Sequence, residues 1–229
     1  MAKPLKTDQL RKNLLADISS AEALVTKVRS LANIHPGGDP RSLHIKYVYR
    51  VVELAFMGVV AEWEDFIEQT FIRYLSTGVS GSGYSPPHKI GKSKDMQHSY
   101  AMLSHDTNYD PAKHYLRFSD PAWTVSQAEF FFDGGAPYGT IRTNMARLKD
   151  ANKIRNRVAH GSKKCKADFK AVALAYTNPA GNTLSSGYRV GNLLSSSADR
   201  HFGAAARNGD YLQAFFNMFK TMAGDICPT

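Results

Sequence analysis

The pattern of apolar and polar positions along the chain predicts mainly helical structure. In residues 7–32, apolar residues recur at intervals of three and four, which places them on one stripe of a helix. A segment rich in Pro and Gly at residues 35–40 then ends this helix. Residues 42–76 contain no Pro and a single Gly, and their apolar positions cover more than one stripe. We expect this second helix to be buried on two sides, against its own chain and against a second protomer.

Residues 77–137 have a different composition, rich in Gly, Ser, Pro, Asp, Tyr and His. We interpret them as an insertion between core helices, with short helices near residues 96–103 and 126–131, because a structureless loop of this length is unusual. The insertion also contains many aromatic residues, which are expected to pack inside it, although they are also able to stack on nucleic-acid bases. These residues are Tyr100, Tyr109, Tyr115, Phe118, Trp123, Phe130, Phe131 and Phe132.

The remainder of the chain returns to helical periodicity. Residues 138–160 have apolar positions at intervals of three and four, and Gly161 is a plausible helix stop. Two apolar stretches at 171–176 and 187–194 flank a Pro- and Gly-containing turn, which predicts a small β-hairpin over 171–194. A last helix is expected at 210–225. The fold class is therefore mainly α, with one domain over residues 1–229, a long insertion and a minor β element.

Charge changes this picture because it is concentrated in one stretch. The chain has 229 residues, is 43% hydrophobic and has a formal net charge of +9. Residues 142–170 contain 10 Lys and Arg residues against Asp150 and Asp168, a net charge of +8. This distribution indicates an anionic partner that binds one part of the chain.

Several protein classes are excluded by what the sequence lacks. No stretch of about 18 apolar residues is present, so no membrane span is expected. The first eight residues lack an apolar signal core, so the cytoplasm is the expected location. Only two cysteines, Cys165 and Cys227, are present, which excludes a disulfide scaffold and a cysteine-based zinc site. No metal and no cofactor is expected.

The candidate chemistry lies in the basic stretch, at Arg155, Asn156 and His160. Attack by a ribose 2′-hydroxyl on the next phosphate needs a base near neutral pH, and histidine titrates in that range. Negative charge that builds on the phosphoryl oxygens can be stabilised by two aligned hydrogen bonds from Arg155. Asn156 can donate and accept hydrogen bonds without titrating, which suits an orienting role. Cleavage of RNA by these groups requires no metal.

An Arg, a polar residue and a His that closes the motif at a helix end resemble the signature of the HEPN superfamily. Residues 61–68 (AEWEDFIE) are similar to the Trp-Glu segment that some HEPN families carry on the preceding long helix. The resemblance covers residues 44–75 and 141–161 and leaves the subfamily open. It implies a helical bundle that forms a homodimer and acts as a metal-independent endoribonuclease. It also implies a role in bacterial defence or in a toxin–antitoxin system, with an antitoxin or regulatory protein as a possible partner.

Five further residues are candidates for supporting roles. Glu64 on the long helix is placed either to pair with Arg155 or to face solvent among neighbouring acids. Residues Arg157, Lys163, Lys164 and Lys166 would bind RNA phosphates on either side of the cut, without sequence preference. The alternative for these four is a solvated basic surface.

One geometric condition limits the motif. Arg155 and His160 are five residues apart, about 140° around a regular helix. Either the last turn loosens before His160, or the two residues meet across a dimer.

Two alternatives to an enzyme stay open. In the first, the chain is a non-catalytic HEPN-like module that binds RNA or a nucleotide or mediates dimerisation. In the second, it is a helical scaffold whose basic stretch binds an acidic protein. The alternative for the motif itself is that Arg155 and Arg157 form a solvated surface and that His160 is a cation at a helix C-terminus, where the helix dipole favours it.

Overall fold

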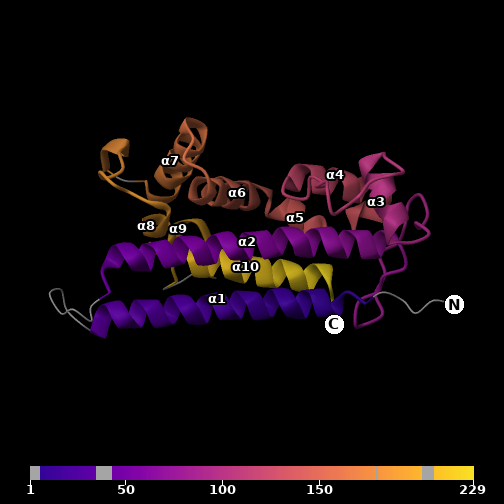
Figure 1. The fold of residues 1–229 in the computed structure, drawn as a ribbon, viewed down its shortest axis with the longest axis horizontal. Coiled ribbons are helices and arrows are strands. Elements are labelled where there is room, and N and C mark those ends of the chain that lie inside the picture. Colours follow the sequence, from indigo (N-terminus) through magenta and orange to yellow (C-terminus); the bar gives the residue numbers. More distant parts are fainter. Residues whose placement is uncertain (1–5, 35–42, 179, 203–208) are drawn as a thin grey trace. The chain divides into compact units, whose positions relative to one another are not determined.

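The fold is described from a computed structural model, over residues 6–34, 43–178, 180–202 and 209–229. The prediction of a mainly helical protein is confirmed. Figure 1 labels the helices, which are α1 (Asp8–Ile34), α2 (Ile45–Leu75), α3 (Met96–Ser104), α4 (Pro121–Phe131), α5 (Gly139–Thr143), α6 (Met145–Ala159), α7 (Lys163–Thr177), α8 (Val190–Leu194), α9 (Asp199–Phe202) and α10 (Tyr211–Ile226). Short 3₁₀ turns occur at Asp133–Gly135 and Ala180–Asn182. The turn predicted at residues 35–40 lies outside the described residues. So do residues 1–5, which are part of the N-terminal stretch in which no signal core was expected.

The chain divides into two compact units. Unit 1 consists of Met1–Leu15, Glu62–Lys149 and Phe219–Thr229, and unit 2 consists of Ala16–Ala61 and Asp150–Met218. The predicted insertion therefore belongs to unit 1, whereas the motif residues Arg155, Asn156 and His160 belong to unit 2.

Aromatic packing builds the core of unit 1 around Phe71 of α2. The Phe71 side chain is fully buried, and its ring centroid lies 5.4 Å from that of Phe118, 5.2 Å from that of Phe132 and 5.0 Å from that of Tyr138. Buried aromatic rings contribute large apolar areas and prefer such tilted contacts. Because Phe118 and Phe132 come from residues 77–137, this segment is held in place by the core that it covers.

Most of the aromatic residues in the insertion are packed, as expected. Tyr100, Tyr109, Phe118, Phe131 and Phe132 are at most 6% exposed, and Trp123 is half-buried. Tyr115 and Phe130 differ, because their exposed fractions are 94% and 56%.

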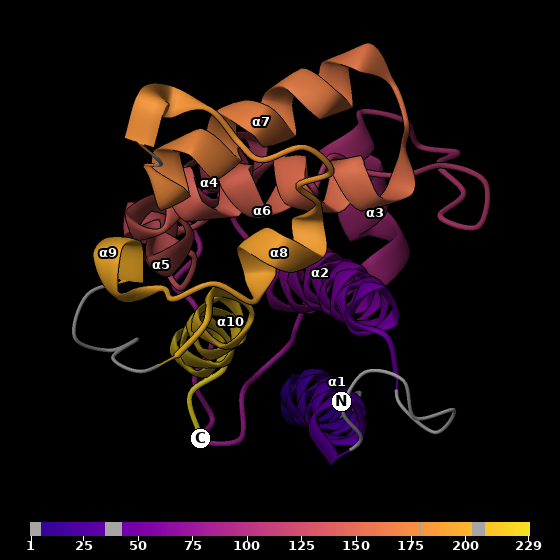
Figure 2. The same ribbon diagram turned by 90° about the vertical axis from the view of Figure 1, so that its left-hand side faces the viewer.

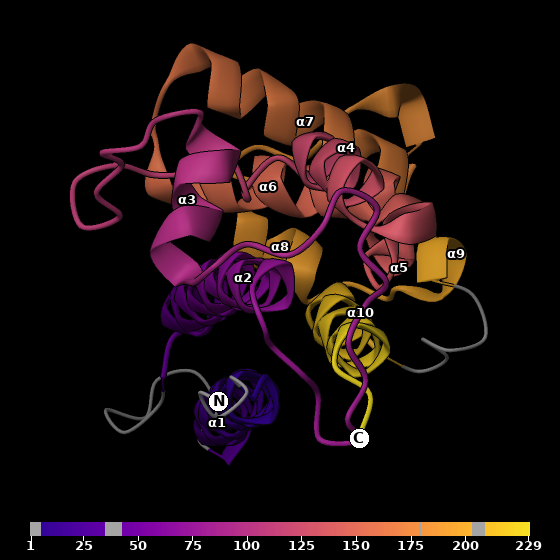
Figure 3. The ribbon, with the colours of Figure 1, turned by 90° about the vertical axis from the view of Figure 1, so that its right-hand side faces the viewer.

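Helix α3 lies beside the end of α2 in the ribbon (Figure 3). The Ser99 hydroxyl of α3 donates a hydrogen bond to the Ile72 carbonyl of α2, at 3.2 Å. Asp95 begins α3, and its side chain accepts a hydrogen bond from the His98 amide at 2.7 Å. Such N-cap residues satisfy amides that have no partner inside the helix. Polar residues of the insertion are thus used to start its helices.

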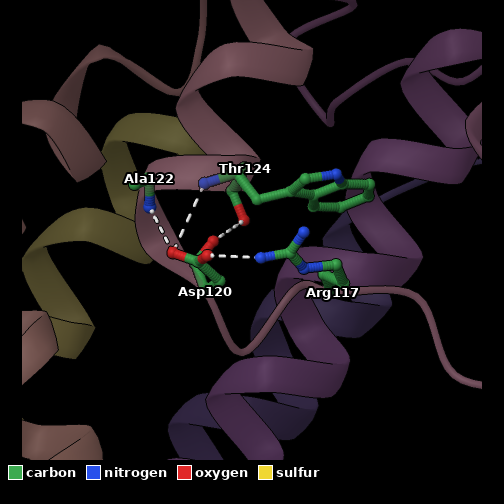
Figure 4. A network of polar contacts seen from close by, with 5 residues as sticks. Arg117, Asp120, Ala122 and Thr124 are labelled. Atoms are coloured by element: carbon green, nitrogen blue, oxygen red, sulfur yellow. Dashed lines mark hydrogen bonds and ion pairs between the residues drawn. The ribbon is translucent and has the colours of Figure 1, made fainter.

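Helix α4 begins in the same way, at the sequence Asp120-Pro121. The Asp120 carboxylate accepts from the Ala122 amide at 3.0 Å, and Arg117 forms an ion pair with it at 3.2 Å (Figure 4). The Thr124 hydroxyl donates to the Asp120 carbonyl at 3.1 Å. Proline at the first position of a helix needs no amide partner, which makes Asp-Pro a strong start signal. Helix α4 begins at Pro121, five residues before the start at residue 126 that the apolar pattern predicted.

Unit 2 has its own aromatic core. The ring centroid of Tyr176 lies 4.9 Å from that of Tyr211 and 4.6 Å from that of His201, and Phe56 of α2 contacts Phe215 at 5.4 Å. The Tyr211 hydroxyl donates to the Tyr176 carbonyl at 3.0 Å. These contacts connect α2, α7, α9 and α10 within this unit, and Figure 2 shows its helices α7, α8 and α9 in orange and yellow.

The predicted β-hairpin at 171–194 is wrong. Residues 171–176 are the second half of α7, and residues 190–194 form α8. The buried positions of α7 are spaced as on one side of a helix, and they are Phe169, Val172, Ala173 and Tyr176. The apolar stretch used for the prediction began at residue 171 and therefore contained only the second part of this pattern. Asn178 ends α7 in the left-handed conformation, with φ of 41°, so the turn signal marks a helix C-terminus.

The helix predicted at 138–160 is interrupted once. Asn144 separates α5 from α6, and its side-chain amide donates to the Thr140 carbonyl at 3.0 Å. Asparagine competes in this way with the backbone hydrogen bonds of a helix. None of the helices in the described part of the chain is long and apolar enough to cross a lipid bilayer.

Candidate functional site

Helix α6 positions the motif residues. Ala151 and Ile154 are buried on its inner side, at 1% and 0% exposed, which fixes the rotation of the helix. Arg155 and Asn156 are then half-buried, whereas His160 is exposed directly after the last helical residue, Ala159. The imidazole is therefore accessible to a large substrate, and the arginine lies closer to the protein body.

The last turn of α6 does not loosen before His160. The His160 amide donates to the Asn156 carbonyl at 2.8 Å, which is the regular hydrogen bond between residues four apart in an α-helix. The expected separation of about 140° between Arg155 and His160 is therefore retained. Of the two geometric alternatives, loosening of the helix is wrong, and convergence across a dimer stays a prediction.

Two motif residues contact each other directly. Arg155 Nη1 donates to Asn156 Oδ1 at 2.9 Å. The amide oxygen of Asn156 is thus used by the arginine, and its NH₂ group keeps two donors. Within one chain, Asn156 orients Arg155.

Glu64 and Arg155 belong to different units, Glu64 to unit 1 and Arg155 to unit 2. Glu64 is half-buried on α2. Its pairing with Arg155 stays a prediction.

The three candidate lysines lie at the start of helix α7. Ser162 caps α7, with its hydroxyl accepting from the Cys165 amide at 3.1 Å, and Lys163, Lys164 and Lys166 are exposed in the first turn. Positive side chains at a helix N-terminus oppose the helix dipole, which favours anions there. Among the described residues none of these lysines forms an ion pair with a carboxylate. A bound polyanion would relieve this local repulsion.

Arg157 connects the motif to a pocket that the sequence did not reveal. Arg157 Nη1 donates to the His160 carbonyl at 3.3 Å, and the same residue lines a pocket of about 260 Å³. All of the lining residues belong to unit 2, and they are Arg50, Glu53, Arg157, Val158, Arg189 and Val190.

The pocket is mainly cationic. Glu53 is its one carboxylate, and the Glu53 side chain is only 9% exposed. One Glu53 oxygen accepts from Arg50 Nη1 at 3.2 Å and the other from the Gly191 amide at 3.2 Å. Three arginines thus line a pocket whose one carboxylate is paired with Arg50 alone. No spacing in the sequence could have shown this, because Arg50, Arg157 and Arg189 come from three segments that are far apart along the chain.

Metal ligation was not expected from the sequence. Across the described ranges, no three His, Cys, Asp or Glu side chains gather in a way that could hold a metal ion.

Comparison with models of protein families, with curated proteins and with solved structures found no match to this chain. The function is therefore inferred from the residues of this chain.

Proposed function

We propose that this protein is a metal-independent endoribonuclease that acts as a dimer. The observation that carries the proposal is the exposure of His160 at the end of α6, within the stretch that carries most of the net positive charge. An accessible histidine surrounded by cations can reach a phosphodiester that those cations bind. The similarity of Arg155, Asn156 and His160 to the HEPN signature supports the same assignment.

Each motif residue has one role in this reaction. His160 removes the proton from a ribose 2′-hydroxyl or donates one to the departing 5′-oxygen. Arg155, held by Asn156 Oδ1, stabilises the charge on the phosphoryl oxygens. Arg157, Lys163, Lys164 and Lys166 bind the phosphates on either side of the cut. The products are a 2′,3′-cyclic phosphate and a 5′-hydroxyl end.

A second protomer completes the site. One chain supplies a single motif histidine, and the reaction needs both a base and an acid. In addition, Arg155 and His160 lie on different sides of α6 because the helix is regular up to the His160 amide. A two-fold dimer would bring His160 of one copy to Arg155 of the other.

The nuclease assignment is tested by incubating RNA with the pure protein in EDTA. Cleavage is expected to persist in EDTA, to fall at least about a hundredfold in His160→Ala, and to spare a position with a 2′-deoxy sugar. His160 is exposed, so His160→Ala should melt as the wild type does, and this comparison is the control. Loss of cleavage on chelation, or full activity in His160→Ala, would contradict the proposal.

The dimeric site is tested by mixing two inactive variants, Arg155→Ala and His160→Ala. If each site takes its arginine from one copy and a histidine from the other, each mixed dimer contains one site with an arginine and one histidine. Because about half of the dimers are mixed and the second histidine is missing from that site, an equimolar mixture should regain detectable activity, below about a quarter of the wild-type level. No recovery in a mixture shown to exchange subunits would contradict this arrangement.

The cellular setting follows from the resemblance alone. HEPN ribonucleases act in bacterial defence and in toxin–antitoxin systems, so a toxin restrained by an acidic antitoxin is the role we assign. The exposed lysines at the start of α7 are a surface for such a partner.

A second candidate is a non-catalytic module that binds RNA or a nucleotide. The regular end of α6 favours it, because Arg155 and His160 do not converge within one chain. This module would bind RNA with strong salt dependence, equally in wild type and His160→Ala, and would generate no new RNA ends.

A further inference from the structure

Three arginines converge in unit 2 at a place that the nuclease motif does not explain. Arg50 comes from α2, Arg157 from the last turn of α6, and Arg189 precedes α8. All three line the pocket of about 260 Å³. Like charges repel one another, so such a cluster is unfavourable unless an anion neutralises it.

The carboxylate in this pocket leaves most of that charge uncompensated. Both oxygens of Glu53 are already used, one by Arg50 Nη1 and the other by the Gly191 amide. Within the described ranges, neither Arg157 nor Arg189 forms an ion pair with an acidic side chain. The pocket is therefore lined by three arginines and one carboxylate, an excess of two positive charges.

The backbone around the pocket is fixed before any ligand arrives. Gly191 lies so close to α2 that an added Cβ would collide with the backbone of Tyr49, and α8 lies against α2 in Figure 2. The Arg189 amide donates to Asn192 Oδ1 at 2.9 Å, and Val190 is buried. A site whose walls are already ordered loses little conformational entropy on binding.

We infer that Arg50, Arg157 and Arg189 form a phosphate-binding site. The planar guanidinium group donates paired hydrogen bonds to phosphate oxygens, and three of them surround one polar cavity. The volume lies just below the range of about 300–1,000 Å³ typical of small-molecule sites, which suits one phosphorylated sugar better than a dinucleotide. The ligand is a phosphate group, from an RNA backbone or from a mononucleotide.

The pocket adjoins the motif. Arg157 Nη1 donates to the His160 carbonyl, so the residue that lines the pocket also contacts the backbone of the proposed catalytic residue. If the nuclease proposal holds, the site binds a substrate phosphate near the cut. The phosphate-binding inference itself rests on the pocket and does not require cleavage.

The test is calorimetric titration of the full-length protein with three probes. These are inorganic phosphate, uridine 3′-monophosphate and a short 2′-O-methyl oligoribonucleotide, which cannot be cut because its 2′-oxygens are blocked. Arg157→Gln and Arg189→Gln should each weaken binding about tenfold, since a hydrogen bond to a charged group contributes about that much. If the two variants bind both the mononucleotide and the oligonucleotide more weakly than the wild type does, a single nucleotide is sufficient as the ligand. If they bind only the oligonucleotide more weakly, the ligand is an RNA backbone.

A matched variant removes the same charge elsewhere. Arg117→Gln, in unit 1, takes away an arginine that is exposed and ion-paired with Asp120, and it should change binding by less than about twofold. Melting curves of all variants check that each is folded. Binding by Arg157→Gln and Arg189→Gln at the wild-type level, an equal loss in Arg117→Gln, or no binding of any probe would overturn the inference.

A further variant should act in the opposite direction. Glu53→Gln keeps an amide oxygen for the Gly191 amide but releases Arg50 from its carboxylate. Binding of phosphate should therefore become tighter, by about threefold or more. Weaker binding in a folded Glu53→Gln protein would contradict the site. A wild type that cuts no RNA but whose binding depends on these arginines would refute the nuclease proposal and leave the phosphate site standing.

Discussion

Residues 77–137 of unit 1 and residues 150–170 of unit 2 are both rich in polar side chains, but they use them differently. In the first region, Asp95 and Asp120 cap helices and Asp120 also pairs with Arg117. In the second region, His160 and the lysines at the start of α7 are exposed. Polar groups that satisfy their own backbone stabilise a fold, whereas exposed cations without acidic partners are available to a ligand.

The comparison extends to the aromatic residues. The insertion buries most of its rings, and Phe118, Phe131 and Phe132 pack around Phe71, which explains how a segment rich in Gly and Pro is ordered. Among the aromatic residues of the insertion, Tyr115 and Phe130 are exposed enough to stack on a base, and the Phe130 ring also packs edge-on against Phe131. Binding of RNA is therefore expected in unit 2, where the charge lies, and the folding energy of unit 1 is expected to come from its aromatic core.

The largest expected effect is on the core of unit 1. Phe71→Ala would remove a fully buried ring that contacts four other rings, and it should lower the free energy of unfolding by about 3–5 kcal/mol. Chemical denaturation measures this change. Phe130→Ala is the control, because its ring is 56% exposed, and it should cost less than about 0.5 kcal/mol. Equal effects of the two variants would show that the insertion is not held by Phe71.

The next effect concerns the lysines of unit 2. Replacing Lys163, Lys164 and Lys166 by Gln should weaken binding of single-stranded RNA and lower the slope of log K against log salt by about 2. Fluorescence anisotropy across a salt series gives the slope. The matched control replaces Lys89, Lys92 and Lys94, which are exposed in the insertion, and its slope should stay near that of the wild type. A similar decrease in both triple variants would mean that RNA binding depends on total charge.

The smallest effect tests a half-buried acid of unit 1, Glu68. Burial raises the pKa of Glu68, the hydrogen bond from the Tyr100 hydroxyl at 3.1 Å lowers it, and Asp65 raises it further. Because the folded pKa is above the unfolded one, the stability that Glu68 contributes is complete below the unfolded pKa and is lost as pH rises through the folded pKa. Glu68→Gln should therefore raise the melting temperature at pH 7 by about 1 °C, after discounting for solvent screening, and by less at pH 4.

The control for this prediction is Glu62→Gln, an exposed acid on the same helix. At pH 7 it should change the melting temperature by less than Glu68→Gln does, because substitutions of exposed side chains have small effects on stability. A destabilised Glu68→Gln at pH 7 would show that the Tyr100 contact outweighs the effect of burial.

Helical periodicity in the sequence was enough to predict most of the helices, because one buried stripe repeats over many residues. It failed at residues 171–176, where a short apolar run does not distinguish a strand from the end of a helix. Exposure of His160 was consistent with its place at a helix end. Arg50, Glu53 and Arg189 could not have been predicted, because their convergence depends on the close approach of Gly191 to Tyr49.

Photocrosslinking tests the central contrast most directly. An RNA that contains 4-thiouridine would be crosslinked to the His160→Ala protein, which should bind without cutting, and the modified peptides identified by mass spectrometry. We expect crosslinks within residues 150–170 and beside the pocket residues Arg50 and Arg189. Crosslinks confined to residues 77–137, at Tyr115 or Phe130, would contradict it.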